Sequence, residues 1–262
     1  MAANCSLNAR EAMSLLALTS RPDYDARVAQ IVRKISRAVD SAEALGLLDE
    51  ATHRLGAEVS AFVSFVRDDQ SREMFRFLLA CDAAWCIEYE EQAWYGHDPW
   101  LTYAKSNSEP IRSSELPIGS KNDKTVLDLA AKYGFTSAVI FPAPSSGNTS
   151  RTGVLCLGSS IPGFFDDDGY IGLKVAARGL AMELHEWWIK QIRHELVNEA
   201  NLTEDDLALL QHEHRGHSSK TIAAELDTSP SSIDSRFQRL NQKLRVPNRK
   251  AAAALAVEYG LI

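Results

Sequence analysis

The C-terminal segment 202–262 constrains the fold most, because residues that favour helix starts recur ahead of regularly spaced apolar residues. Thr203, Ser218 and Ser229 each precede such a pattern, and Pro230 occupies the first helical position after Ser229. Four apolar residues of the third expected helix fall within about 40° of one another on a helical wheel. They are Ile233, Phe237, Leu240 and Leu244. The segment therefore predicts a small helical domain whose third helix has one buried and one exposed face.

The exposed face of this third helix carries short polar side chains, glutamine and arginine. Glutamine can bind the edge of adenine, and arginine can bind guanine or phosphate, so this face suits the major groove of DNA. A helix face in contact with water alone would have a similar composition. The candidate DNA-binding residues in this segment are Ser218, Ser231, Ser232, Asp234, Ser235, Arg236, Gln238, Arg239, Gln242 and Lys243.

The charge is unevenly distributed along the chain. The net charge of −7 falls on residues 1–200, because residues 201–262 contain eight Lys/Arg and eight Asp/Glu. Six of those eight basic residues lie between Arg236 and Lys250. A neutral domain with one basic flank can still bind a polyanion, since the local potential governs the encounter.

The order of residues from Leu202 to Arg249 resembles the helix-turn-helix of LuxR-type transcription regulators, with Leu210 and Gly216 at matching positions and Asp206 where the family usually has glutamate. The Pro-Arg pair that usually follows the first threonine is replaced here by Glu204–Asp205. The resemblance implies four helices, of which the third, at about 229–244, enters the major groove and the fourth, at about 250–259, often serves as a dimer contact in the family. It also implies a homodimer on a nearly palindromic double-stranded operator.

Residues 24–190 combine helical and strand patterns. An apolar stripe at Val28, Ile31, Val32, Ile35 and Val39 and a leucine-rich stretch up to Leu55 predict two helices. Apolar, β-rich runs predict strands at 59–66, 74–79, 137–141 and 153–157. Further helices are expected at 82–93, 99–105, 125–133 and 166–188, the last with a stripe at Ile171, Val175, Leu180, Leu184 and Trp187, and mostly loop at 106–124. The expected fold class is α+β, an α/β/α sandwich with a mostly antiparallel sheet, followed by the all-α helix-turn-helix domain.

Trp85, Tyr89 and Asp98 form a possible polar set for a small ligand. The two aromatic residues are four positions apart on one expected helix, so they can face one pocket. Their N–H and O–H groups can bond carbonyls, and ionised Asp98 can accept an amide N–H. Alternatively, the two aromatics are core residues and Asp98 is the N-cap before Pro99; both interpretations can hold together.

The spacing Trp85, Tyr89, Asp98 and Pro99 resembles the acyl-homoserine-lactone binding domain of quorum-sensing LuxR-type regulators. By this resemblance, Trp85 holds the lactone carbonyl, Tyr89 the acyl carbonyl and Asp98 the amide, and the strands pack the acyl tail. The signal is then the small-molecule ligand, with no other cofactor.

Three positions depart from that family. Cys81 stands where an aromatic residue is common, Ser113 near a family tryptophan, and Ala138 at a common glycine. These changes are compatible with an aryl or longer acyl group, with a signal other than a lactone, or with a pocket that has lost its ligand. Trp100 and Cys156 are further candidate ligand contacts, and Cys156 is equally compatible with a plain core position.

Other chemistries find little support in the sequence. His212, His214 and His217 do not predict a metal site, because 212 and 214 face different sides of a helix and 217 follows Gly216. None of the four cysteines forms a CxxC pair, and no nucleophile motif predicts an enzyme. Without a signal peptide or a long apolar run, we expect a cytoplasmic protein with reduced thiols and no membrane partner.

The expected organisation is an N-terminal extension (1–24), a signal-binding and dimerisation domain (25–190), a linker (191–201) and the DNA-binding domain (202–262). The expected function is that of a ligand-responsive transcription regulator of the quorum-sensing type. The alternative is a regulator that binds DNA without ligand, or one that forms inactive heterodimers with another LuxR-type protein. Neither the signal, nor the operator, nor the sign of regulation follows from the sequence.

Overall fold

The computed structural model describes residues 13–67, 73–145 and 151–262. It divides into two compact units. The N-terminal unit comprises residues up to Ser64, Arg76–Pro144 and Thr152–Leu184, and the C-terminal unit comprises Phe65–Phe75, Ser145–Arg151 and His185–Ile262. The first half of the expected extension (1–24), with Cys5, and parts of the expected turns at 67–69 and 142–151 lie outside the described residues.

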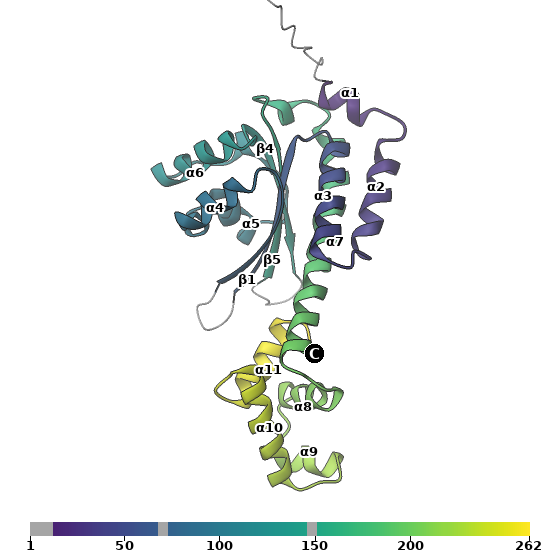
Figure 1. The fold of residues 1–262 in the computed structure, drawn as a ribbon, viewed down its shortest axis with the longest axis vertical. Helices are drawn as coiled ribbons and strands as arrows, with labels where there is room; N and C mark the ends of the chain where they lie inside the picture. The colour runs from purple at the N-terminus through teal and green to yellow at the C-terminus, as the bar shows by residue number, and fades with distance from the viewer. Residues whose placement is uncertain (1–12, 68–72, 146–150) are drawn as a thin grey trace, which may run out of the picture. The chain divides into compact units, whose positions relative to one another are not determined.

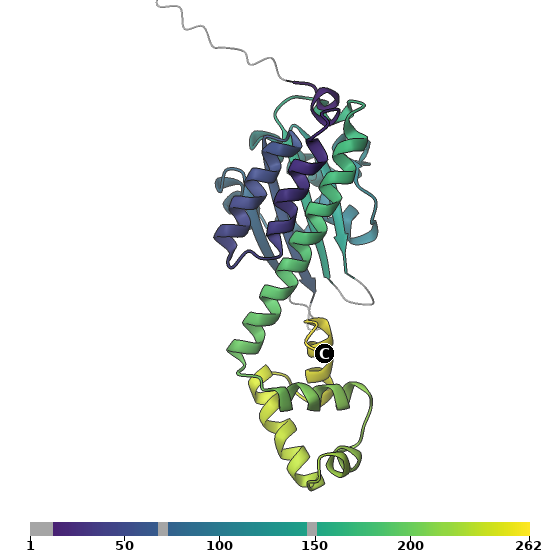
Figure 2. The ribbon, with the colours of Figure 1, turned by 90° about the vertical axis from the view of Figure 1, so that its right-hand side faces the viewer.

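The N-terminal unit is built from a five-stranded sheet between two layers of helices (Figures 1 and 2). One face carries α2 (Tyr24–Ile35), α3 (Ser41–Leu55) and α7 (Tyr170–Glu199). The other carries α4 (Ala84–Glu91), α5 (Pro99–Ser106) and α6 (Lys121–Lys132). The short helix α1 (Leu15–Thr19) precedes α2, and 3₁₀ turns occur at Trp94–Gly96, Ser113–Glu115 and Phe164–Asp166. The expected α+β fold class is confirmed.

The strands are β1 (Val59–Arg67), β2 (Glu73–Ala80), β3 (Ile111–Arg112), β4 (Ser137–Pro144) and β5 (Arg151–Ser159), in the order β2-β1-β5-β4-β3. The pairs β3/β4 and β4/β5 are antiparallel, with Ile140 opposite both Ile111 and Cys156. Nearly every residue of β4 and β5 is buried. Because helices cover both sheet faces, these strands are continuous apolar runs without the alternation of a half-exposed strand.

Two expected apolar stripes differ from the structure. Val39 is 79% exposed, because α2 ends at Ile35 and the chain then turns toward the cap of α3. On α7, Ile171 and Val175 are exposed, while Leu180, Leu184 and Trp187 are buried as expected. The buried face at the start of α7 is formed by Leu173 and Ala177 instead. The helical period is as expected, but in the first two turns the wrong side of the helix was assigned to the core.

Three element boundaries also differ from expectation. The segment 106–124 contains the edge strand β3, and α6 already starts at Lys121, where Ser120 and Asp123 form a capping box. The long helix starts at Tyr170 rather than at 166, after a 3₁₀ turn; the polar segment 189–202, expected to continue this helix and then form the linker, is helical up to Glu199. No helix in the described part of the chain is long and apolar enough to cross a membrane.

The C-terminal unit contains α8 (Glu204–His214), α9 (Ser219–Glu225), α10 (Pro230–Leu244) and α11 (Arg249–Glu258). The expected caps are confirmed: the side chains of Thr203, Ser218 and Ser229 each accept a backbone N–H of their helix. The four apolar residues of α10 are all buried. Elsewhere in this unit Leu209 and Leu210 are fully buried, Leu207 is half-buried and Leu226 is 40% exposed.

The core of α10 generates a stability prediction. We expect Leu240→Ala to lower the free energy of unfolding by about 2–5 kcal/mol, because this fully buried side chain would leave a cavity. The exposed leucine of the same unit is the matched control, and Leu226→Ala should cost less than about 1 kcal/mol. Urea unfolding of the full chain, followed by far-ultraviolet circular dichroism, measures both. Equal losses in the two variants would contradict the assigned core.

Candidate functional site

A small apolar cavity lies between the sheet and the α4–α5 side of the N-terminal unit. Its walls come from β1, β2, α4, α5 and β5. The space that the centre of a water molecule can occupy is about 20 Å³, which is room for about one water. The lining residues are Ala61, Val63, Phe77, Leu79, Trp85, Cys86, Tyr89, Asp98, Trp100, Leu101, Val154 and Cys156. Five of the six predicted ligand-binding residues therefore line one cavity.

Asp98 is the charged residue of this cavity, and it is 5% exposed. One carboxylate oxygen, Oδ1, accepts the backbone N–H of Trp100 (2.7 Å) and of Leu101 (3.4 Å), which caps α5. The other, Oδ2, accepts the Tyr89 hydroxyl at 2.7 Å. Burial raises the pKa of Asp98 above its ordinary value, and the hydrogen bonds from Tyr89 and the backbone counteract that rise. The N-cap interpretation of Asp98 is thus confirmed, and Asp98 also lines the cavity, whereas its binding of a ligand amide stays a prediction.

Tyr89 and Cys156 are neutral members of the cavity wall. Burial, followed by the nearby Asp98 carboxylate, raises the pKa of the Tyr89 hydroxyl well above its ordinary value. The same two causes raise the pKa of the Cys156 thiol. The Tyr89 hydroxyl donates its hydrogen bond to the Asp98 carboxylate. The lone pairs of the Tyr89 oxygen therefore remain available for an incoming donor.

The tryptophans bring two unpaired donors to this site. The indole N–H groups of Trp85 and Trp100 are buried, and neither has a hydrogen-bond partner among the described residues. A buried donor without an acceptor costs about 1–3 kcal/mol. A ligand that offers carbonyl oxygens at these positions would remove that cost.

Phe135 packs against both tryptophans, and the sequence did not predict its place at this site. Its ring centroid lies 4.9 Å from that of Trp85 and 5.8 Å from that of Trp100. Gly158 on the neighbouring strand makes room for it, because a Cβ there would come within 2.4 Å of the Phe135 ring. Gly134, with φ +93°, turns the chain just before Phe135. A glycine followed by an aromatic residue at a strand start was the available signal.

Ser113 lies outside this cavity. Its hydroxyl accepts the backbone N–H of Ala138 at 3.0 Å, which ties the turn after β3 to β4. It lines a second, wider pocket of about 290 Å³, bordered also by Trp100, Phe135 and Asp166. Trp100 borders both spaces. Of the strands expected to pack an acyl tail, β1, β2 and β5 line the small cavity and β4 does not.

The candidate DNA-binding residues fall into two groups. Gln238, Arg239 and Gln242 are exposed on α10, and their side chains make no hydrogen bond or ion pair with the described residues. Arg236 and Lys243 instead pair with carboxylates at the start of α8, Asp205 at 2.9 Å and Asp206 at 2.6 Å, respectively. The unpaired group is free to contact a partner, and the paired group holds α10 against α8.

The serines and Asp234 of the predicted set mostly serve the helix starts. Ser218 caps α9. Ser231 and Ser232 lie in the first turn of α10, where the Ser231 hydroxyl is hydrogen-bonded to the Ser229 hydroxyl and the Ser232 backbone N–H donates to it. The Ser235 hydroxyl donates to the Ser231 carbonyl oxygen. The Asp234 carboxylate accepts the Ser219 hydroxyl at 2.6 Å and thereby links α10 to α9. All of these except Ser232, which is half-buried, are exposed.

One polar network connects the four helices of the C-terminal unit. Arg249, at the start of α11, contacts the buried Glu213 of α8 at 2.7 Å and donates to the Ser219 hydroxyl of α9 at 2.9 Å. Its guanidinium also lies over the ring of Phe237 of α10, 5.1 Å from the ring centroid. Through Ser219 the network continues to Asp234. This arrangement fixes the position of α10, whose exposed face remains free.

Two family profiles match the chain. The family described as "Autoinducer binding domain" matches residues 40–186, and the family described as "Bacterial regulatory proteins, luxR family" matches residues 200–256. No curated protein sequence gives a significant match.

Solved structures share the fold at low sequence identity. SdiA in complex with octanoyl-rac-glycerol is 16% identical and covers 92% of this chain and 97% of its own, with a TM-score of 0.68. Escherichia coli SdiA in a second crystal form has the same identity and a TM-score of 0.67, covering 92% of this chain and 99% of its own. The N-acylhomoserine lactone dependent LuxR family transcription factor CepR2 from Burkholderia cenocepacia is 16% identical and covers 63% of this chain and 98% of its own, with a TM-score of 0.53.

Proposed function

Because the chain belongs to the LuxR family of bacterial transcription regulators that carry an autoinducer-binding domain, we propose that it binds an acyl signal in the cavity around Trp85 and Asp98. As a member of this family it is a non-enzymatic transcription regulator of the quorum-sensing type. Binding of the signal would stabilise the state of the protein that dimerises on a nearly palindromic operator.

The unpaired indole N–H groups of Trp85 and Trp100 carry the proposal. They lie in a cavity with apolar walls that also holds the Asp98 carboxylate and the Tyr89 hydroxyl. Two donors and an acceptor match the carbonyls and the amide N–H of an acyl-homoserine lactone. A monoacylglycerol offers an ester carbonyl and hydroxyl groups to the same set, and the related SdiA has been crystallised with octanoyl-rac-glycerol.

The small size of the cavity requires side chains to move when a signal binds. About 20 Å³ is far less than an acyl chain needs, whereas typical ligand pockets measure about 300–1,000 Å³. Trp100 borders both the cavity and the wider pocket beside it, so a displacement of its ring would join the two. Binding would then be coupled to a rearrangement of α5.

The same small cavity favours a second candidate function, that of a regulator that works without ligand or as a heterodimer with another LuxR-type protein. The cavity walls pack against one another with little space between them, and the position of Ser113 outside the cavity removes one expected ligand contact. Thermal melts of the purified protein with acyl- and aryl-homoserine lactones and with 1-octanoylglycerol separate the two functions. A ligand at about 100 times its Kd adds about 2.7 kcal/mol to the free energy of unfolding. An unchanged melting temperature with every ligand tested favours the second candidate.

The charge of Asp98 provides the first test of the site. Asp98→Asn keeps a cap oxygen for α5 but replaces an acceptor with an amide that also donates. We expect ligand affinity to fall at least about tenfold, since a charged hydrogen bond contributes about 1.5–3 kcal/mol. Asp40, the N-cap of α3, is the matched control, because it is exposed and outside the cavity. Asp40→Asn should bind the ligand normally; a normal response of Asp98→Asn would contradict the assigned role.

Trp85 provides the second test, because a substitution can remove its N–H and still keep an aromatic ring. Trp85→Phe keeps an aromatic side chain and removes a donor that is unpaired in the structure. We expect the melting temperature without ligand to change little and ligand affinity to fall about tenfold, the effect of losing one hydrogen bond of about 1.4 kcal/mol. Trp188 of α7 also has an unpaired buried indole N–H but does not line the cavity, so Trp188→Phe is the control. Equal affinity losses in both variants would show that the Trp85 N–H has no specific role.

The exposed face of α10 provides the third test. We expect Gln238→Ala and Arg239→Ala to weaken binding to an operator selected from random DNA, by about 1–3 kcal/mol if the side chain contacts a base. Ligand affinity and unfolding should stay as in the wild type, because neither side chain forms a hydrogen bond or ion pair within the described part of the protein. Gln211→Ala, at an exposed glutamine of α8, is the control. Electrophoretic mobility shifts measure binding; wild-type affinity in both α10 variants would exclude this face from the DNA interface.

A further inference from the structure

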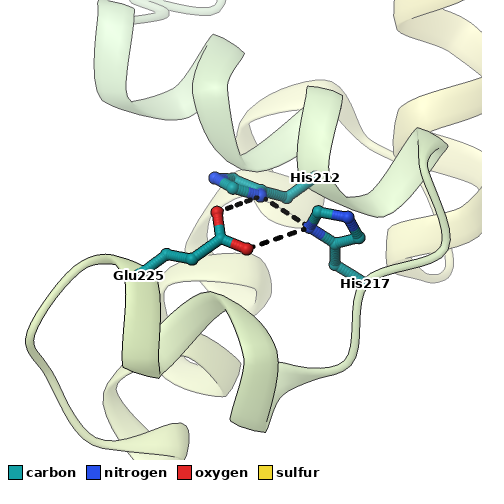
Figure 3. Close-up of side chains that lie close together, drawn as sticks. All are labelled: His212, His217 and Glu225. Carbon is teal, nitrogen blue, oxygen red and sulfur yellow. Dashed lines mark hydrogen bonds and ion pairs between the residues drawn. The ribbon is translucent and has the colours of Figure 1, made fainter.

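The C-terminal unit brings two histidines and a glutamate together outside the proposed DNA-binding face. His212 lies in the last turn of α8, His217 in the connection that follows, and Glu225 at the end of α9 (Figure 3). The two histidine Nδ1 atoms are 3.0 Å apart. Each lies 3.6 Å from one oxygen of the Glu225 carboxylate. The side chains converge from three separate segments on one point.

The spacing of these atoms fits a metal ion. Zinc binds histidine nitrogen and carboxylate oxygen at about 2.0–2.2 Å, so two ligand atoms of a tetrahedral site lie about 3.3–3.5 Å apart. The observed separations of 3.0, 3.6 and 3.6 Å lie on either side of that value. All three ligand atoms lie within 4.8 Å of one another, so small side-chain shifts would place one ion in contact with each.

The chemistry of the three groups also suits a divalent transition metal. Two Nδ1 atoms at hydrogen-bond distance can share only one proton between two neutral rings, and a metal ion can replace that proton. Neutral imidazole and carboxylate are common ligands of zinc and its neighbours. The side chain of His212 is 13% exposed, that of His217 30% and that of Glu225 48%, so solvent can reach a fourth position.

We propose that His212, His217 and Glu225 form a site for a divalent first-row transition metal of the zinc type, with water as the fourth ligand. The ion links the end of α8 to the end of α9, and Glu225 lies just before the turn that leads into α10. Occupancy of the site therefore fixes α8 and α9, the two helices that support α10. The sequence predicted no metal, because His214 faces away and the carboxylate comes from a helix that the spacing of the histidines does not reveal.

Zinc uptake by the full-length protein without an affinity tag tests the site, with isothermal titration of ZnCl₂ as the assay. We expect one Zn²⁺ per chain. Glu225→Gln and His217→Ala should each weaken its binding at least about tenfold, since even the outer-shell partners of a metal site contribute about 10–100-fold. His214 is the matched control, because it is exposed on the same helix end and outside the cluster. His214→Ala should bind Zn²⁺ as the wild type does.

Two further measurements separate a metal site from a change in folding. Glu225 is an exposed residue, so Glu225→Gln should keep the wild-type circular dichroism spectrum while it loses the rise in melting temperature that Zn²⁺ gives the wild type. Co²⁺ should bind with a tetrahedral spectrum that lacks a thiolate charge-transfer band, which excludes binding by cysteine. No uptake by the wild type, or the same Zn²⁺ affinity in Glu225→Gln and His217→Ala, would overturn the proposal.

Discussion

The buried carboxylate of Asp98 is the contact on which the proposed signal site depends. It receives the hydroxyl of Tyr89 from α4 and two backbone N–H groups from α5. These three donors keep a charge inside an apolar wall, at a cost that the raised pKa of Asp98 records. The position of two helices and the polarity of the cavity therefore depend on one side chain, and the hydrogen bonds that fold this region also hold the carboxylate at the proposed signal site.

Local sequence signals predicted the C-terminal unit well, because caps and helical periodicity act over a few residues. Thr203, Ser218 and Ser229 cap their helices as expected. Features that depend on packing between distant segments were not predictable in this way. Val175 belongs to an apolar pattern but is exposed, since the neighbouring elements decide which side of α7 is covered. The position of Phe135 between two tryptophans depends on the sheet register and on the space above Gly158. Neither feature can be predicted from a single sequence.

The C-terminal unit separates its charged residues by task. Arg236, Lys243 and Arg249 are engaged in contacts within the protein and hold the helices together. Gln238 and Arg239 have no such contacts and remain exposed on α10. Counting basic residues along the sequence does not distinguish these groups, because the partners of Arg236 and Lys243 lie about thirty residues earlier, on α8. The fold thus pairs three of the six basic residues between Arg236 and Lys250 with carboxylates, and the other three are left for a partner to meet.

The tight packing around the cavity has a consequence for the timing of the proposed response. A ligand larger than one water can enter only while side chains such as Trp100 are displaced, so its association rate is the diffusional rate multiplied by the fraction of time spent open. Once the side chains close again, the same barrier slows escape. If the proposed signal binds in this cavity, the protein would average the signal concentration over the lifetime of the bound state, and fluctuations briefer than that lifetime would leave the occupancy unchanged.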